Sequence, residues 1–388
     1  MWRGLSILLI CIAGCGGGNR PLAIGSAAPD FALPGADGKT HTLAEYAASP
    51  VLAVVFTCNH CRASQLYEAR LRKLDEDYRA KGVRLVAINS DRADAIPLSE
   101  LASSDVGDSL ADMKARVAYR RIEYPYLYDG DTQSVAAKFH VETLPHIFLF
   151  DRDRKLRYEG RIDDNVNESL VQSRDPRNVN EPLVHNRDAR NAIEAMLAGR
   201  RVPVERTEVA GCALLTASKT ASRQQELAKI QAEPVALQMA DEAALKKLRG
   251  NPTGKLLLVN FWATWCGPCV TEFPELETTY RMYRTRGFDF VSVSANDPDD
   301  KPQVIEFLKK NHASGLNYQF ATPDTFGLQA AFDPAMPAAV PFTLLIAPNG
   351  DVLFQQLGEL DFLKLRRAIL ANLTDDPALQ GYWSASAN

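Results

Sequence analysis

Apolar and polar positions along the chain form two successive sets of predicted elements, and the first set occupies the N-terminal half. Apolar runs predict strands at 50–57, 83–89, 124–128 and 143–151. Apolar residues at helical spacing predict helices at 63–80, 109–119, 132–139 and 188–197. An Asp-Gly turn between short alternating runs at 23–43 predicts a hairpin ahead of these elements. This alternation of strands and helices predicts an α/β domain.

The second set repeats this order in the C-terminal half. Strands are expected at 255–262, 288–294 and 339–346, followed by a hairpin turn and a last strand. Helices are expected at 241–248, 270–280, 301–311, 324–332 and 361–373. In each half a strand leads into a Cys-x-x-Cys motif, a helix follows the motif, and a proline opens a later strand. This is the order of the thioredoxin fold, so we expect an α/β protein with two tandem thioredoxin-like folds, each a central mixed β-sheet flanked by helices.

Length and local composition divide the chain into five segments. At 388 residues it is longer than one ordinary domain. We assign residues 1–20 to a signal peptide and tether, and 21–210 to a first domain that ends in a stretch rich in Asn, Asp and Arg. A polar linker at 211–233 leads to a second domain at 234–374, and the tail at 375–388 has no periodic pattern.

Composition and charge are those of a globular protein without nucleic-acid partners. Hydrophobic residues make up 46% of the chain and charged residues 24%, and the formal net charge is −4. Binding to phosphate backbones requires a concentrated basic face, and no segment of this sequence supplies one. We therefore expect no nucleic acid among the partners.

The N-terminus has the pattern of an export signal. Arg3 precedes an apolar core at 5–12 that is too short to span a bilayer as a mature helix, and small residues stand directly before Cys15. The Ile-Ala-Gly-Cys sequence resembles a bacterial lipobox, which implies cleavage before Cys15 and lipidation of its sulfur. A plain secretory signal is the alternative. Both place the protein in the cell envelope, facing the periplasm when anchored by lipid, where disulfides persist.

The second Cys-x-x-Cys motif has the elements of a dithiol redox site. Cys266 stands at the start of the predicted helix, where free N–H groups and the helix dipole favour a thiolate. Cys269 follows one turn later, close enough to form a disulfide with Cys266. In such a site Cys266 attacks a partner disulfide, and Cys269 then attacks Cys266 to release the reduced partner. This chemistry needs no cofactor beyond the redox-active disulfide, and we expect no metal.

The sequence around this motif carries a family resemblance. VNFWATWCGPC at 259–269 resembles thioredoxin, and the Glu-Phe-Pro that follows is similar to membrane-tethered envelope thioredoxins of the ResA/TlpA type. The resemblance implies that Trp265 and the backbone of Val340 and Pro341 flank the exposed sulfur and bind an extended substrate segment. It also implies that Pro341 is a cis-proline that faces the cysteines.

One position departs from thioredoxin. Thioredoxin has a buried aspartate where this chain has Asn260, so the carboxylate that helps to deprotonate the second cysteine is missing there. Glu272 is a candidate substitute. The alternative is that its helix position only exposes it to solvent.

The first half has its own family resemblance. FTCNHC, VRLVAINSD, YPYLYD, LPHIFLFDRDRKLRYEGRIDDN and a later Gly-Cys together resemble peroxiredoxin-like redoxins of the CNHC type. This implies a redox pair at Cys58 and Cys61, with Leu144 and the cis-proline Pro145 beside it on the substrate side. Arg62 stands where these relatives usually have proline, which leaves the start of the following helix open.

Two further residues could modify the first site. An imidazolium at His60, inside the motif, would stabilise the Cys58 thiolate and make this the more oxidising of the two sites. Cys212 lies in a partly apolar stretch, where a buried inert thiol is the default expectation. Because its Gly-Cys recurs in the CNHC relatives, redox partnership with Cys58 or Cys61 is a second hypothesis.

Several other chemistries are less well supported by the motifs. A shared zinc knuckle is disfavoured because the two motifs lie far apart and each opens its own helix. A c-type haem requires histidine directly after the motif, where this chain has Arg62 and Val270. Peroxiredoxins place threonine three residues before the attacking cysteine, whereas Thr57 directly precedes Cys58 and lies four residues before Cys61.

These observations predict an exported thiol-disulfide oxidoreductase that exchanges disulfides with envelope proteins through both motifs. Its partners would be protein thiols and disulfides and an electron donor of unknown identity, and it would contact the membrane only through the lipid anchor. One alternative is a thiol peroxidase whose second domain recycles the first. A non-enzymatic alternative is a copper-binding metallochaperone that uses Cys58 and Cys61 with His140 or His146.

Overall fold

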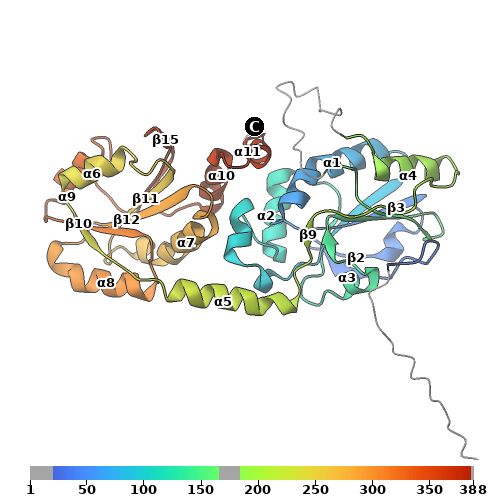
Figure 1. The fold of residues 1–388 in the computed structure, drawn as a ribbon, viewed down its shortest axis with the longest axis horizontal. Helices are drawn as coiled ribbons and strands as arrows, with labels where there is room; N and C mark the ends of the chain where they lie inside the picture. Colours follow the sequence, from blue (N-terminus) through green and yellow to red (C-terminus); the bar gives the residue numbers. More distant parts are fainter. Residues whose placement is uncertain (1–20, 166–183, 386–388) are drawn as a thin grey trace, which may run out of the picture.

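The computed structural model describes residues 21–165 and 184–385, which form two α/β domains (Figure 1). The predicted signal peptide, with Cys15 as its lipidation site, lies outside the described residues. Within the described ranges, no helix has both the length and the apolar character needed to cross a membrane.

The first domain has a five-stranded mixed sheet in the order β5-β4-β3-β7-β8. Its strands are β3 (Val51–Thr57), β4 (Val83–Asn89), β5 (Tyr126–Tyr128), β7 (His146–Phe150) and β8 (Leu156–Gly160). β3, β4 and β5 are parallel to one another. β7 is antiparallel to β3, and β8 is antiparallel to β7. The α-helices of this domain are α1 (Arg62–Arg79), α2 (Leu110–Arg120), α3 (Ser134–Phe139) and α4 (Asp188–Leu197). The predicted hairpin at the start of the domain is confirmed as β1 (Ala32–Pro34) and β2 (Thr40–Thr42).

The second domain has a six-stranded mixed sheet in the order β10-β13-β12-β11-β14-β15. Its strands are β10 (Gln238–Ala240), β11 (Leu256–Trp262), β12 (Phe288–Ser294), β13 (Leu316–Phe320), β14 (Phe342–Ile346) and β15 (Val352–Leu357). Its α-helices are α6 (Glu242–Arg249), α7 (Gly267–Tyr283), α8 (Lys301–Lys310), α9 (Thr325–Phe332) and α10 (Phe362–Asn372). The predicted fold class, two tandem thioredoxin-like folds, is confirmed.

Both central strands are buried along their whole length because a parallel strand inside a sheet is covered on its two faces. Every residue of β3 and of β11 is buried. β3 ends directly before its Cys-x-x-Cys motif and β11 ends three residues before its own, so each motif lies at the carboxyl edge of its sheet. This is the edge at which open α/β sheets place their functional residues.

The segment 211–233, predicted as a linker, contains regular structure that contacts the first domain. Its first residues form β9 (Cys212–Ala213), which pairs antiparallel with β6 (Thr143–Leu144) of the first domain. α5 (Thr220–Gln231) follows and runs along one side of the molecule toward the second domain (Figure 1). Glu226 of α5 accepts hydrogen bonds from the backbone of the first domain, including one of 2.7 Å from the Leu98 N–H.

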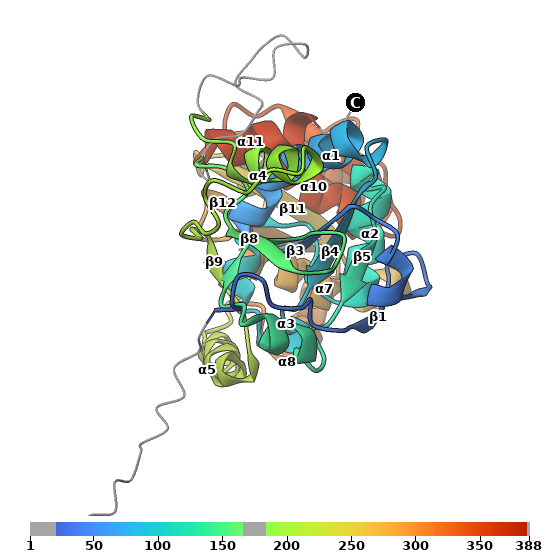
Figure 2. The ribbon, with the colours of Figure 1, turned by 90° about the vertical axis from the view of Figure 1, so that its right-hand side faces the viewer.

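The tail at 375–388, in which we found no periodic pattern, contains a helix. Residues Pro377–Ser384 form α11, which packs beside α1 of the first domain and α10 of the second (Figures 1 and 2). Asp376 caps the helix by accepting a hydrogen bond of 3.1 Å from the Leu379 N–H. The apolar side chains of the helix, Leu379, Tyr382 and Trp383, are buried. Their spacing over one turn, with a capping aspartate and a proline ahead, was the sequence signal for this helix.

The two domains share a hydrophobic core. One cluster of buried side chains includes Leu66 and Leu101 of the first domain, Leu276 and Leu365 of the second, and Trp383 of α11. Buried polar contacts cross the same boundary. The Tyr283 hydroxyl donates to the Ser104 carbonyl at 2.6 Å, and Arg116 donates to the Tyr382 hydroxyl at 2.9 Å.

Candidate functional site

In the second domain the motif cysteines are joined to each other. Cys266 and Cys269 form a disulfide, with their Cα atoms 5.3 Å apart. Cys266 is the N-cap of α7, and its sulfur accepts a hydrogen bond of 3.3 Å from the Cys269 N–H. The predicted position of Cys266 at a helix N-terminus is therefore confirmed. The neighbouring Trp265 is 67% exposed, whereas both sulfur-bearing residues are buried.

The Val340–Pro341 peptide bond is cis, as predicted. Pro341 immediately precedes β14, and its carbonyl accepts a hydrogen bond from the Gly358 N–H. Within residues 184–385, no strand pairs with Val340, the residue before the cis-proline. The backbone at this edge is thus not paired by the chain's own strands.

Glu272 is buried on α7, one turn after Cys269, so the alternative of a solvent-exposed Glu272 is wrong. Burial raises the pKa of its carboxyl to about 7, although hydrogen bonds from the Leu360 N–H and from Asn260 act in the opposite direction. Asn260 is fully buried on β11 and donates a hydrogen bond of 3.0 Å to the Thr343 hydroxyl. A group that titrates near neutral pH therefore lies beside the second cysteine of the motif.

In the first domain the motif cysteines are separated. Cys61 forms a disulfide with Cys212, 151 residues later, and Cys58 is a buried free thiol. The predicted Cys58–Cys61 pair is thus not the disulfide of this structure, and the hypothesis that Cys212 is a redox partner is supported by its bond to Cys61. The spacing of the cysteines could not show which of them pairs with Cys61. Cys212 reaches the motif only because β9 pairs with β6.

The segment that carries Cys212 lies directly beside the cis-proline of this domain. The Leu144–Pro145 bond is cis, as predicted, and Leu144 pairs with Cys212 in the β6–β9 ladder. The approach is close: a Cβ atom on Gly211 would lie 1.9 Å from the Leu144 carbonyl oxygen. The chain's own segment therefore covers the backbone edge that the family resemblance assigns to a substrate.

The helix after the first motif begins later than its counterpart in the second domain. Cys61, the second cysteine, is the N-cap of α1, whereas Cys266, the first cysteine, is the N-cap of α7. Asn59 explains the difference, since it is fixed outside the helix by buried contacts. Its N–H donates to the Asp108 carboxylate at 2.5 Å, its side chain donates to the Gly107 carbonyl at 2.8 Å, and its carbonyl accepts from Arg116 at 3.2 Å.

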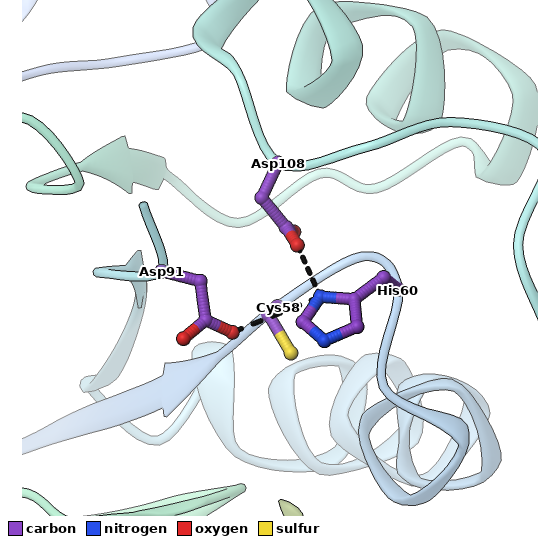
Figure 3. A group of neighbouring side chains, drawn as sticks. All are labelled: Cys58, His60, Asp91 and Asp108. Carbon is purple, nitrogen blue, oxygen red and sulfur yellow. Dashed lines mark hydrogen bonds and ion pairs between the residues drawn. The ribbon is translucent and has the colours of Figure 1, made fainter. Parts of the chain in front are cut away.

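Four buried side chains gather around the free thiol (Figure 3). They are Cys58, His60, Asp91 and Asp108, and their ligand atoms all lie within 4.8 Å of one another. The His60 Nδ1 atom makes a short hydrogen bond with Asp108 Oδ2 and lies 3.8 Å from Asp91 Oδ2. Neither aspartate was predicted from the sequence. Asp91 follows the buried strand β4 closely, and the carboxyl ends of parallel strands meet at one edge of a sheet, so its position was a usable signal.

The Cys58 thiol does not have the lowered pKa that we expected from an imidazolium at His60. Burial raises the pKa of the Cys58 thiol well above its ordinary value, and the nearby charges of Asp91 and Asp108 raise it further. Burial by itself lowers the pKa of His60, but the charge and hydrogen bond of Asp108 outweigh burial and raise it to about 9. The imidazolium is thus stabilised by carboxylates rather than by the thiolate.

The carboxyl groups of the two aspartates differ in their protonation. Burial, together with the charge of Asp108, raises the pKa of Asp91 to about 7. Burial acts in the same direction on Asp108, but the charge and hydrogen bond of His60 outweigh it and hold the pKa of Asp108 below its ordinary value. Asp108 is therefore the aspartate of the cluster that is ionised at neutral pH.

The histidines of the copper alternative lie elsewhere. His146 is stacked on Phe148, with 4.2 Å between the ring centroids, and burial lowers its pKa to about 4. His140 ends α3 in the left-handed conformation. Neither belongs to the group of metal-ligand side chains found among the described residues, and the Cys61 sulfur is occupied by its bond to Cys212.

Comparison with known proteins assigns both domains to related families. Residues 24–159 match the AhpC/TSA family, and residues 228–368 match the Redoxin family. Thiol-disulfide oxidoreductase ResA of Bacillus subtilis (strain 168) is 32% identical over 99 residues, which are 26% of this chain and 51% of that protein. ResA of Halalkalibacterium halodurans is 41% identical over 106 residues, with corresponding shares of 26% and 52%. The chain thus spans about half the length of the curated relatives it matches.

A solved structure of a hypothetical protein from Sinorhizobium meliloti 1021 is also similar. It is 35% identical, and the match covers 51% of this chain and 97% of that one, with a TM-score of 0.42. The two family matches show two tandem thioredoxin-like domains, one similar to the AhpC/TSA family and one to the Redoxin family, and the named homologues are thiol-disulfide oxidoreductases.

Proposed function

We propose that this protein is an exported, lipid-anchored thiol-disulfide oxidoreductase that exchanges disulfides with proteins of the cell envelope. The observation that carries the proposal is the Cys266–Cys269 disulfide at the N-terminus of α7. A disulfide in this position can accept two electrons to become a dithiol, and the helix N-terminus stabilises the thiolate that results. The exposed Trp265 and the backbone of Val340, beside the cis-proline Pro341, are the surface that would bind an extended partner segment.

The exchange proceeds through two thiolate attacks. In the reduced enzyme the Cys266 thiolate attacks one sulfur of the partner disulfide, and the other partner sulfur leaves as a thiolate. Cys269 then loses its proton, attacks the Cys266 sulfur and releases the partner as a dithiol. The two electrons gained by the partner come from the Cys266–Cys269 dithiol, which a separate dithiol donor must reduce again.

Glu272 is the group that we assign to deprotonation of Cys269. It lies one turn further along the same helix, and its pKa of about 7 is suited to proton transfer near neutral pH. Asn260 occupies the strand position at which thioredoxin has a carboxylate. Glu272 would supply this carboxylate from α7 instead of from β11. We class Glu272 as a positioning and proton-transfer residue for this step.

In the first domain we assign the redox role to Cys61 and Cys212. Their disulfide joins the motif to the segment that covers the cis-Pro145 edge, so its reduction would free that segment to leave Leu144. Partner binding at Leu144 and Pro145 would then require release of β9. The net direction of exchange in the envelope depends on the two reduction potentials.

A reduction assay with insulin as the disulfide substrate tests the proposal. The wild-type chain should reduce insulin when a dithiol donor is supplied, Cys266→Ser should be inactive, and Cys58→Ser should retain activity. Absence of turnover by the folded wild-type chain would refute the proposal.

The match of residues 24–159 to the AhpC/TSA family favours a thiol peroxidase as the second candidate function. In that case hydrogen peroxide would be consumed in a reaction that depends on Cys61 and Cys212, and the second domain would recycle them. Peroxide consumption that survives Cys61→Ser would exclude this candidate.

A further inference from the structure

The cluster around Cys58 combines three kinds of metal-ligand atom in one buried site. The ligand atoms are a thiol sulfur, an imidazole nitrogen and carboxylate oxygens, and none of the residues is more than 4% exposed. They come from separate parts of the first domain: the motif after β3, the end of β4, and the loop before α2 (Figure 3). The fold, rather than local sequence, therefore brings them together.

Asp91 provides a second observation that points to a ligand. It is fully buried, and its Oδ1 accepts a hydrogen bond of 2.6 Å from the Leu215 N–H. Its Oδ2 faces the cluster and lies 3.8 Å from the His60 Nδ1 atom, but it has no hydrogen-bond partner among the described residues (Figure 3). A buried carboxylate oxygen without a hydrogen bond is costly, and such oxygens commonly bind a cation.

The charges of the cluster also favour a cation. Two carboxyl groups and a thiol surround a single imidazole, so the site can carry more negative than positive charge. Glu100 lies 4.0 Å from the His60 Nε2 atom and adds a further carboxylate on the exposed side. Within the described residues no Lys or Arg forms an ion pair with Asp91 or Asp108.

We propose that the first domain binds a divalent ion of the zinc class, through the side chains of Cys58, His60, Asp91 and Asp108. Thiolate and imidazole ligands select zinc and similar transition metals over magnesium and calcium, which prefer oxygen ligands. Four protein ligands complete a tetrahedral shell, so the site is of the closed, structural type.

Binding requires one local adjustment. The His60 Nδ1 and Asp108 Oδ2 atoms now share a hydrogen bond, whereas two ligands of a tetrahedral zinc ion lie about 3.3 Å apart. The ion takes the place of the proton between them and moves the two side chains apart. The Asn59 N–H and the Asn89 side chain hold the other Asp108 oxygen, at 2.5 Å and 2.7 Å, and keep the carboxylate oriented toward the site.

The site goes beyond the disulfide exchange proposed above and uses none of its residues. Cys61 and Cys212 are bonded to each other, so Cys58 is the thiol of this domain that remains for a metal. The oxidised domain should therefore bind the ion without reduction of either disulfide. Metal binding and exchange activity can be tested separately.

Metal titration of the full chain, without added reductant, tests the inference. After dialysis against a chelator, the chain is incubated with Zn²⁺, separated from free metal by gel filtration, and its zinc content is measured by mass spectrometry. Wild type should retain one equivalent more than Cys58→Ser or Asp91→Asn. Glu100→Gln should match wild type, since Glu100 lies outside the four ligands, and Cys266→Ser should do so as well.

A spectroscopic readout identifies the ligands. Co²⁺ in place of Zn²⁺ should give a thiolate-to-cobalt charge-transfer band and intense d–d bands of a tetrahedral ion, and Cys58→Ser should abolish the charge-transfer band. Near-ultraviolet circular dichroism verifies that each variant is folded. If folded wild type retains less than one equivalent of zinc and gives no cobalt–thiolate band, the inference is wrong. This outcome is measured on wild type alone and is decisive even if a variant fails to fold.

Discussion

The two Cys-x-x-Cys motifs occupy the same place in their domains but have different partners. Each follows a buried central strand and lies in a domain with a cis-proline before an antiparallel strand. In the second domain Cys266 bonds to Cys269, and the edge before the cis-proline is unpaired by the chain's strands. In the first domain Cys61 bonds to Cys212, whose segment pairs with that edge.

The difference shows that the surroundings of a motif, rather than its spacing, select the disulfide partner. Asn59 is held outside α1 by contacts with the loop before α2, so that helix begins only after the second cysteine. No comparable contact with Gly267 is found among residues 21–165 and 184–385, and α7 begins directly after the first cysteine. The same spacing thus gives one local dithiol and one link to a distant segment.

The largest expected effect is that of Cys266→Ser on disulfide reduction. Loss of the attacking sulfur should lower the insulin-reduction rate to that of a reaction without enzyme, because the mixed disulfide cannot form. The matched change Cys58→Ser should leave most of the rate. An equal loss of rate in both variants would mean that the two motifs act as one site, and would contradict the difference between the two domains described above.

Removal of Cys212 should destabilise the chain more than removal of Cys269. The Cys61–Cys212 bond closes a loop with a sequence separation of 151, whereas that of Cys266–Cys269 is 3. The chain-entropy relation gives losses of about 5 kcal/mol for Cys212→Ser and about 2 kcal/mol for Cys269→Ser. Denaturant unfolding without reductant measures both, and an equal loss would show that the long loop is already constrained in the unfolded chain.

Glu272→Gln should change the pH dependence of the second site. Below its pKa of about 7 the Glu272 carboxyl is protonated and cannot accept the Cys269 proton, so the wild-type rate should rise as the pH increases through 7. The variant should lose this rise and be slower by about a hundredfold at pH 8. Single-turnover kinetics against pH measure the effect, and an unchanged profile would remove Glu272 from the mechanism.

The same pKa has a consequence for stability. Because folding raises the pKa of Glu272, the folded state holds this proton more tightly than the unfolded state. The contribution of the protonated Glu272 carboxyl to the free energy of unfolding is therefore present at low pH and is lost as the pH rises through about 7. The melting temperature of wild type should fall more than that of Glu272→Gln between pH 5 and 8.

The smallest expected effect is that of Trp265→Ala. Trp265 is 67% exposed, so its removal should leave the melting temperature unchanged. An aromatic contact with a bound partner contributes about 1 kcal/mol, so KM for a protein disulfide should rise about fivefold while kcat stays constant. A small disulfide that cannot reach the indole is the control substrate, and its KM should not change.

Sequence predicted the elements whose signals are local. The apolar runs at 50–57 and 255–262 and the helices after both motifs depend on neighbouring residues, whereas the two cis-prolines were expected from the family resemblance. Strands β10 and β13 were missed because they are short, and β13 alternates polar residues that are buried, including Asn317 and Gln319.

Features that depend on contacts between distant segments could not be predicted from the motifs. The bond between Cys61 and Cys212 requires β9 to reach β6, and the cluster around Cys58 requires Asp108 to approach from the loop before α2. The burial that raises the pKa of the Cys58 thiol arises in the same way. The motifs show which residue types a site contains, but the packing of the domain determines which of these residues are ionised.

The hydrophobic core shared by the two domains has a consequence for how the molecule unfolds. Side chains of both domains, together with those of α11, belong to one buried cluster, so neither domain can open its part without exposing apolar surface of the other. Loss of α11 would remove Leu379, Tyr382 and Trp383 from this cluster. The two redoxin domains therefore constitute a single cooperative unit, and the distance between their disulfides is fixed by the fold rather than by a flexible tether.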